Sequence, residues 1–244
     1  MNPEPAVYPD AATPARPPIR AVRLRGDLDE PLSRWLWLVK WVLAIPHYVV
    51  LFFLWIAFWV VTVVAWFAIL FTERYPRSLF DFSVGVMRWS WRVQFYTYAA
   101  LGTDRYPPFT LRPADYPADL EVDYPQRLSR GLVLVKWWLL AIPHYLILAA
   151  LLSGGVVLGG NSGNGNGNNT IPLLGVLVLI AAVALLFTGR YPSGLFGFVV
   201  GVNRWFYRVL AYSALLTDEY PPFRLDQGAR EPEADAEHQV NPAL

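Results

Sequence analysis

Two long stretches of the sequence contain no Asp, Glu, Lys or Arg, and no other feature limits the fold as strongly. They cover residues 41–72 and 137–189, about a third of the 244-residue chain. A transmembrane helix needs about 20 consecutive, mostly apolar residues. Only 16% of the chain is charged, against about 25% in soluble domains. We therefore predict an all-α integral membrane protein, since a helix satisfies its own backbone hydrogen bonds in lipid.

Composition and motifs exclude several classes of function. The chain has no Cys, which removes disulfides, thiolate metal sites and cysteine nucleophiles. Its net charge of +1 leaves no basic excess for nucleic acid. The sequence has no HExxH, GxSxG, P-loop or Rossmann pattern. We expect no enzyme activity, no catalytic residue, no cofactor, no metal site and no nucleic-acid partner.

The chain is a tandem duplication. Residues 32–48 match residues 128–145 with one inserted residue. Residues 71–93 match residues 187–209 at 15 of 23 positions, and the motif TDxYPPF follows in both copies. An internal repeat of this kind predicts two copies of one structural unit.

The duplication predicts five regions. They are a disordered cytoplasmic tail (1–27), membrane repeat 1 (28–111), an acidic linker (112–123), membrane repeat 2 (124–225) and a disordered acidic tail (226–244). Within repeat 2, residues 153–170 are rich in Gly and Asn, which is typical of a flexible loop. We expect no secretory signal peptide, because Pro and Arg fill the first 30 residues.

Each repeat is predicted to contain a transmembrane helical hairpin. In repeat 2 the Gly/Asn loop separates two apolar helices, and insertions are tolerated at loop tips. The corresponding tip of repeat 1 would lie near residues 53–57. The alternative is an interfacial helix that ends near Pro46, followed by one span over residues 48–72, because residues 51–59 contain no turn residue. Ser33 and Ser129 are the predicted N-caps at the helix starts.

The basic residues predict that both repeats have the same orientation. All 20 Lys and Arg lie outside the two charge-free stretches, so two hairpins place them on one face. The positive-inside rule makes this face cytoplasmic, with both termini on it and the Gly/Asn loop outward. The repeats are then related by a pseudo-two-fold axis along the membrane normal.

An amphipathic segment follows each predicted hairpin. Apolar residues recur at helical spacing, and arginines lie on another face. A helix of this kind lies in the membrane interface, where arginine binds lipid phosphate or simply anchors the helix by snorkelling. The candidate lipid- or partner-binding residues are Arg74, Arg88, Arg92, Arg190, Arg204 and Arg208.

Four ionisable side chains lie within or beside the apolar stretches, namely Lys40, His47, Lys136 and His144. Such residues at membrane depth are functional candidates. A two-fold axis could bring the two histidines together for haem ligation, a metal or a proton relay. In the competing interpretation Lys40 snorkels to the interface, and each imidazole satisfies backbone groups freed by the preceding proline.

The repeated motifs resemble the DUF4389 family. They are KWxLAIPHY, FTxRYPxxLFxF, the segment N/M-R-W-x-x-R-V and TDxYPPF, and they cover nearly all of residues 32–225. The resemblance implies a bacterial, mainly actinobacterial, integral protein of the inner membrane. Because the function of the family is unknown, the resemblance brings no activity and no catalytic residue.

The sequence favours a non-enzymatic scaffold or accessory subunit in envelope or lipid handling. Its expected partners are anionic lipid headgroups and a membrane protein. One alternative is a small transport or conduction element that uses the four lysine and histidine side chains in a homo-oligomer. The other is a haem protein with His47 and His144 as axial ligands.

Overall fold

A computed structural model describes residues 20–97, 99–153, 155–157, 170–188 and 190–230, and this part of the chain is mostly helical. The elements in chain order are β1 (Val22–Gly26), η1 (Leu36–Leu38), α1 (Lys40–Thr72), α2 (Arg77–Tyr96), β2 (Ala118–Val122), α3 (Arg130–Val135), the π-helical turn η2 (Lys136–Leu140), α4 (Ile142–Ser153), β3 (Gly155–Val157), β4 (Thr170–Pro172), α5 (Leu173–Thr188) and α6 (Ser193–Ser213).

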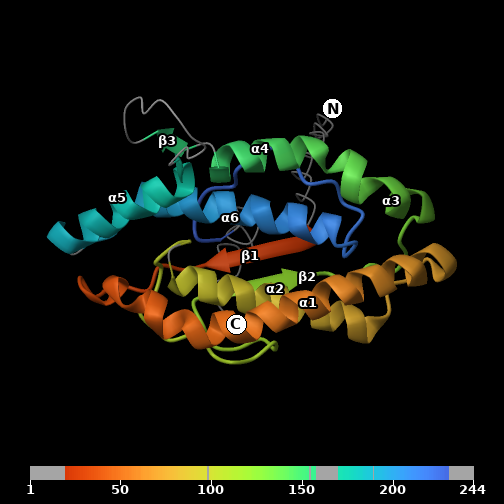
Figure 1. The fold of residues 1–244 in the computed structure, drawn as a ribbon, viewed down its shortest axis with the longest axis horizontal. Coiled ribbons are helices and arrows are strands. Elements are labelled where there is room, and N and C mark those ends of the chain that lie inside the picture. Colours follow the sequence, from red (N-terminus) through yellow and green to blue (C-terminus); the bar gives the residue numbers. More distant parts are fainter. Residues whose placement is uncertain (1–19, 98, 154, 158–169, 189, 231–244) are drawn as a thin grey trace, which may run out of the picture.

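A two-stranded sheet occupies the centre of the molecule, between two similar sets of helices (Figure 1). β1 and β2 pair antiparallel, with Leu24 opposite Leu120. These leucines hold equivalent positions, because VRLRGDLDEPLSR from residue 22 aligns without gaps with ADLEVDYPQRLSR from residue 118. A two-fold axis therefore passes between the strands. It runs along the viewing direction of Figure 1, where a half-turn exchanges α1 and α2 with α3–α5 and α6.

Each strand packs against an inner helix of the opposite half. β1 precedes the first long helix, yet the Arg204 side chain of α6 donates to the carbonyl of Leu24 from Nε at 3.2 Å. In the other half, Nε of Arg88 in α2 donates to the carbonyl of Leu120 in β2 at 2.9 Å. β1 thus completes the second half of the molecule, and β2 completes the first half.

The strands correct three predictions. Residues 22–26 were expected in a disordered tail and residues 118–122 in a linker, and the fold was expected to be purely helical. Inward Val22 and Leu24 alternate with outward Arg23 and Arg25. This alternation covers only five residues, which is too short to distinguish a strand from a charged tail in the sequence. Residues 226–230 of the predicted acidic tail are also packed, since the carbonyl of Ala229 accepts from the Gly26 N–H at 2.9 Å.

The predicted hairpin of repeat 1 is wrong, because α1 is one continuous helix. It runs through the expected tip at residues 53–57 and contains Pro46. Residues 51–59 have no Gly, Pro or Asn, so nothing in the sequence ends the helix there. With 33 residues and a rise of about 1.5 Å per residue, α1 is about 50 Å long.

The second apolar stretch is interrupted, but its helices do not form the predicted hairpin. After α4, the short antiparallel pair β3–β4 precedes α5. Figure 1 shows α4 and α5 following one another along one edge of the molecule. Residues 158–169, most of the predicted Gly/Asn loop, lie outside the described residues. By length and composition, Lys40–Thr72 and Arg130–Ala149 could each cross a membrane.

The helix starts differ between the halves. Ser129 is the N-cap of α3, as predicted, and its side chain accepts from the backbone N–H of Leu132. α1 begins only at Lys40, after Val39, so Ser33 is not its N-cap.

The amphipathic helices α2 and α6 lie in the interior of the protein, so they are not the exposed helices that the sequence predicts. Val86 and Trp91 of α2 and Val199 and Tyr207 of α6 are completely buried in one hydrophobic core. The amphipathic pattern is real, but the polar side of each helix meets strand carbonyls and carboxylates of the protein instead of lipid headgroups.

Gly102 offers a test of this packing. A Cβ there would overlap the ring of Phe95, which is completely buried. We expect Gly102→Ala to lower the free energy of unfolding by about 2 kcal/mol in detergent, as overpacking does. Gly194→Ala is the control, because a Cβ there meets nothing within 4 Å. Equal stability of the two variants would contradict the packing.

Candidate functional site

A buried lysine near the start of each long helix binds the TDxYPPF motif of its own repeat. Lys40 is 2% exposed; its Nζ donates to the carbonyl of Thr103 at 2.7 Å and lies 2.8 Å from Oδ1 of Asp104. The other carboxylate oxygen of Asp104 accepts from the backbone N–H of Ser33. Nζ also lies 5.0 Å from the centre of the Tyr96 ring, within the range of cation–π attraction.

The second half repeats this arrangement. Nζ of Lys136 donates to the carbonyl of Thr217 at 2.8 Å and to Oδ1 of Asp218 at 2.7 Å. Oδ2 of Asp218 accepts from the Ser129 N–H at 2.7 Å, and the Tyr212 ring lies 5.1 Å from Nζ. Neither lysine snorkels to water, since both ammonium groups are held by internal acceptors.

Each histidine is enclosed by aromatic rings of its own repeat. His47 is completely buried and stacks on Phe109, with ring centres 3.9 Å apart and planes 14° apart. The indole N–H of Trp89 donates to its Nδ1 at 3.1 Å. The carbonyl of Leu43, in the turn before Pro46, accepts from the hydroxyl of Tyr106 at 3.0 Å. A tyrosine, and not the imidazole, therefore binds a carbonyl beside the helix proline.

His144 has the same environment with one hydrogen bond fewer. It stacks on Phe223 at 4.3 Å, and the ring of Tyr220 lies 4.9 Å away. Trp205 faces it edge-on at 5.7 Å, but among the described residues the indole N–H has no acceptor.

The structure does not bring the lysines and histidines of the two repeats together. His47 lies on α1 and His144 on α4, and these helices occupy opposite edges of the molecule (Figure 1). Each imidazole stacks on its own phenylalanine, so the two do not face a common ligand. Within the described ranges, no group of three or more His, Asp or Glu side chains is placed to hold a metal.

Four of the six predicted arginines are bound inside the protein. Arg92 and Arg204 are completely buried, and Arg208 is 4% exposed. In the first half, Nε of Arg88 and Nη2 of Arg92 both lie 3.0 Å from Oδ1 of Asp119. These groups hold α2 and α6 on the central strands and the segments beside them, and their guanidinium groups are occupied by acceptors of the protein.

In the second half the acidic partner comes from a different segment. Asp226 lies 2.7 Å from Nη1 of Arg208 and 3.1 Å from Nη1 of Arg20. Burial opposes ionisation of this carboxyl group. The hydrogen bond from Arg208 and the charges of Arg208, Arg20 and Arg224 outweigh burial and hold the pKa of Asp226 below its usual value.

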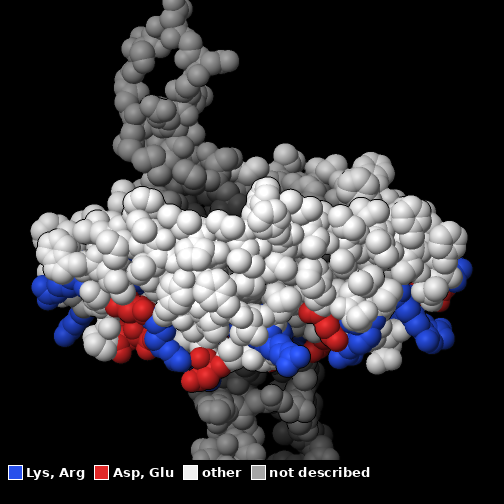
Figure 2. Space-filling model, turned by 60° about the horizontal axis from the view of Figure 1, so that its bottom comes forward, with Lys and Arg blue, Asp and Glu red and all other residues white. Residues whose placement is uncertain are grey.

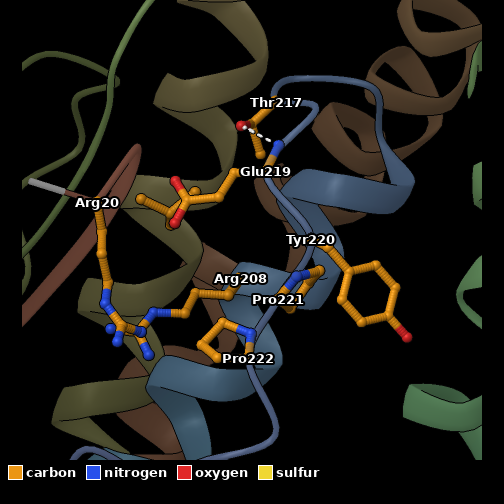
Figure 3. Close-up of a pocket in the computed structure, with 8 residues that line it drawn as sticks. Arg20, Arg208, Thr217, Glu219, Tyr220, Pro221 and Pro222 are labelled. Carbon is orange, nitrogen blue, oxygen red and sulfur yellow. Dashed lines mark hydrogen bonds between the residues drawn. The ribbon is translucent and has the colours of Figure 1, made fainter. Parts of the chain in front are cut away.

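Figure 3 shows a small pocket beside this ion pair. The guanidinium groups of Arg20 and Arg208 lie next to each other, and the ring of Tyr220 points away from them. Glu219 accepts from the backbone N–H of Ala21 at 2.9 Å. The pocket is partly open and its internal volume is about 10 Å³, which is room for about one water.

Arg74 and Arg190 are the two predicted arginines that lie at the surface. They follow α1 and α5 at equivalent positions, and both are exposed. Their backbones are bound, because the N–H of Arg74 donates to Thr72 Oγ1 at 3.3 Å and that of Arg190 to Thr188 Oγ1 at 3.2 Å. No described residue forms an ion pair with either guanidinium.

The acidic partners of these basic groups were not predicted from the sequence; they are Asp104, Asp218, Asp119 and Asp226. The first two could have been found, since Asp occupies the second position of TDxYPPF in both copies. Asp119 and Asp226 gave no such signal, because they come from non-equivalent segments.

Comparison with protein-family models places most of both repeats in one family. The model described as "Domain of unknown function (DUF4389)" matches residues 34–110 and 172–224, consistent with two copies. No curated protein and no solved structure matches the chain.

The equivalent tryptophans of the two repeats, Trp89 and Trp205, give a prediction for the histidine clusters. Trp89 and Trp205 are 5% and 4% exposed, but only Trp89 donates to an imidazole. Trp89→Phe should therefore reduce the free energy of unfolding by about 1 kcal/mol more than Trp205→Phe, because it leaves the buried Nδ1 of His47 without a donor. Denaturant unfolding in detergent measures the free energy of unfolding of both variants. An equal decrease in the two variants would refute the role of this hydrogen bond.

The lowered pKa of Asp226 predicts a pH dependence. The carboxylate contributes stability above its unfolded-state pKa of about 4, and this contribution disappears as the pH falls through the lower folded-state value. Asp226→Asn should lower the free energy of unfolding by about 3 kcal/mol near neutral pH, as loss of one partner of a buried pair does. The difference in stability between the variant and wild type should become smaller below about pH 4. Thermal melts across this pH range measure the difference, and a difference that does not change with pH would contradict the prediction.

Proposed function

The chain belongs to the DUF4389 family, and from that premise we propose that it is a non-enzymatic membrane protein, a scaffold or accessory subunit in envelope or lipid handling. In this proposal the charged face, which is the charged rim of Figure 2 together with the exposed Arg74 and Arg190, binds anionic lipid headgroups and a membrane-protein partner. The membrane is the inner membrane of a bacterium, and the charged face and both termini lie on its cytoplasmic side.

The exposed guanidinium groups of Arg74 and Arg190 carry the lipid-binding part of the proposal. Each lies two residues beyond the end of the last apolar helix of its repeat, where the apolar stretch ends and charged sequence begins. A guanidinium presents several N–H donors in a geometry that fits phosphate, and these two have no acidic partner among the described residues. The four buried arginines do not contribute to this contact.

The accessory role is supported by what the interior lacks. The pocket beside Arg20 and Arg208 is small, about 10 Å³, and His47 and His144 each stack on a phenylalanine of their own repeat. A chain that uses its polar groups to fix its own helices fits a binding or organising role better than turnover of a substrate.

Removing the two exposed arginines tests the lipid contact. We expect the double variant Arg74→Gln and Arg190→Gln to lose about fivefold in preference for anionic vesicles per arginine, corresponding to about 1 kcal/mol each. The measurement is flotation with phosphatidylglycerol-containing vesicles and with pure phosphatidylcholine vesicles.

Arg105→Gln is the matched control. It removes the same charge from an exposed arginine that is already 3.4 Å from Asp115, so binding should be nearly unchanged. An equal loss per removed arginine in the control and in the double variant would show that only net charge matters. Purification without any retained anionic lipid or protein partner would also contradict the proposal.

A further inference from the structure

We infer that the protein inserts into a single leaflet of a bilayer, with its long helices parallel to the membrane plane. The partner of its apolar surface is then the acyl-chain region of that leaflet. The inference rests on the membrane association assumed in the proposed function, and it does not depend on which headgroup binds Arg74 and Arg190.

The outward surface of both long helical segments is apolar. On α1, Phe52 and Phe71 expose 62% and 72% of their surface. On the opposite edge, Leu146 of α4 and Phe187 of α5 expose 67% and 78%. A single protein partner would cover one edge only, whereas acyl chains cover both at once. Apolar surface this extensive marks a membrane or protein contact.

The end of α1 lies at the same height along the two-fold axis as the segment that leads into α1. Glu73, which directly follows α1, binds Nε of Arg130 at the start of α3 at 3.1 Å. Its carbonyl also accepts from the Leu128 N–H at 2.9 Å. The axis relates Arg130 to Arg34, six residues before α1, and rotation about an axis does not change height. The end of α1 is therefore level with residue 34.

A continuous helix whose end is level with the segment before its start does not cross the bilayer along this axis. To cross the bilayer, α1 would have to run along the membrane normal, and the normal would then be the long dimension of Figure 1. The charged residues exclude that orientation. β1 and β2 lie at the centre of the molecule (Figure 1), and their pair Arg23–Glu121, at 3.3 Å, is 34% and 59% exposed.

Figure 2 shows the same distribution over the surface. Charged side chains follow the whole lower rim, beneath a broad uncharged surface. If α1 crossed the membrane lengthwise, the middle of this rim would lie in hydrocarbon, where charge is strongly disfavoured. With the helices in the plane, the whole rim faces headgroups and water, and the uncharged surface faces the acyl chains.

Four of the five exposed tryptophans of the described residues lie near the helix starts, and the fifth, Trp59, lies in the middle of α1. Trp35 and Trp41 flank the start of α1, and Trp137 and Trp138 follow the start of α3; all four are about half exposed or more. Tryptophan favours the boundary between hydrocarbon and headgroups, which agrees with helix starts held at the level of the charged rim.

Single-cysteine labelling tests the orientation, since the chain has no Cys of its own. The full-length variants are Ser33→Cys before α1, Phe53→Cys at its middle and Ser78→Cys after it. They are exposed to a membrane-impermeant maleimide in right-side-out and inside-out vesicles. We expect the two end positions to react from one and the same face, and position 53 to react only after detergent is added.

Every other labelling pattern overturns the inference. End positions that react from opposite faces would show that α1 crosses the membrane. Reaction of position 53 in intact vesicles would show a hairpin tip or a surface outside the lipid. The arginine variants of the proposed function should leave this pattern unchanged, so the two proposals fail separately.

A depth measurement gives a second test that does not depend on labelling from two sides. Nitroxide labels at Ile45→Cys, Phe52→Cys and Val63→Cys report three exposed positions of α1 in vesicles of phosphatidylcholine and phosphatidylglycerol. We expect equal depths from oxygen and nickel accessibility. A helix that crosses the bilayer would separate positions 45 and 63 by about 27 Å of depth, and such a gradient would overturn the inference.

Discussion

The position of each long helix depends on one aspartate, the second residue of TDxYPPF. Asp104 neutralises Lys40 and also accepts from a backbone N–H upstream of α1, and Asp218 does the same for Lys136. An ammonium group buried among apolar residues needs an opposite charge and further hydrogen bonds. This contact also places the aromatic residues that follow the aspartate against the histidine, which lies about two helical turns after the lysine.

Several charged side chains lie inside the protein, and a broad apolar surface lies outside, unlike the usual soluble domain. The internal charges are used in fixed contacts: lysines on TDxYPPF, and arginines on strand carbonyls and on Asp119 and Asp226. This leaves little polar chemistry for a substrate. It also explains why the total of charged residues is a poor guide to the charge that the surface presents.

The sequence predicted the long features of this fold and missed the short ones. The charge-free stretches, the repeat and the amphipathic pattern of α2 and α6 all extend over many residues, so their signals are strong. β1 and β2 have five residues each and alternate charged with apolar positions. The hairpin of repeat 1 was inferred from an insertion in repeat 2, although an insertion can equally interrupt a straight helix. Burial of Arg92 and Arg204 depends on distant strands and could not be read from local spacing.

The pairing of β1 with β2 joins equivalent positions, which makes it isologous, the kind of contact that links identical subunits. Arg23 and Asp119 are equivalent in the duplication, and so are Arg25 and Glu121. Two identical strands in this register would place residue 23 opposite residue 25 of the other, and arginine would meet arginine. In the fused chain Arg23 faces Glu121 instead, because the two halves vary independently. Covalent linkage also turns a concentration-dependent association into an intramolecular one, so that assembly of the two halves does not depend on the concentration of the protein.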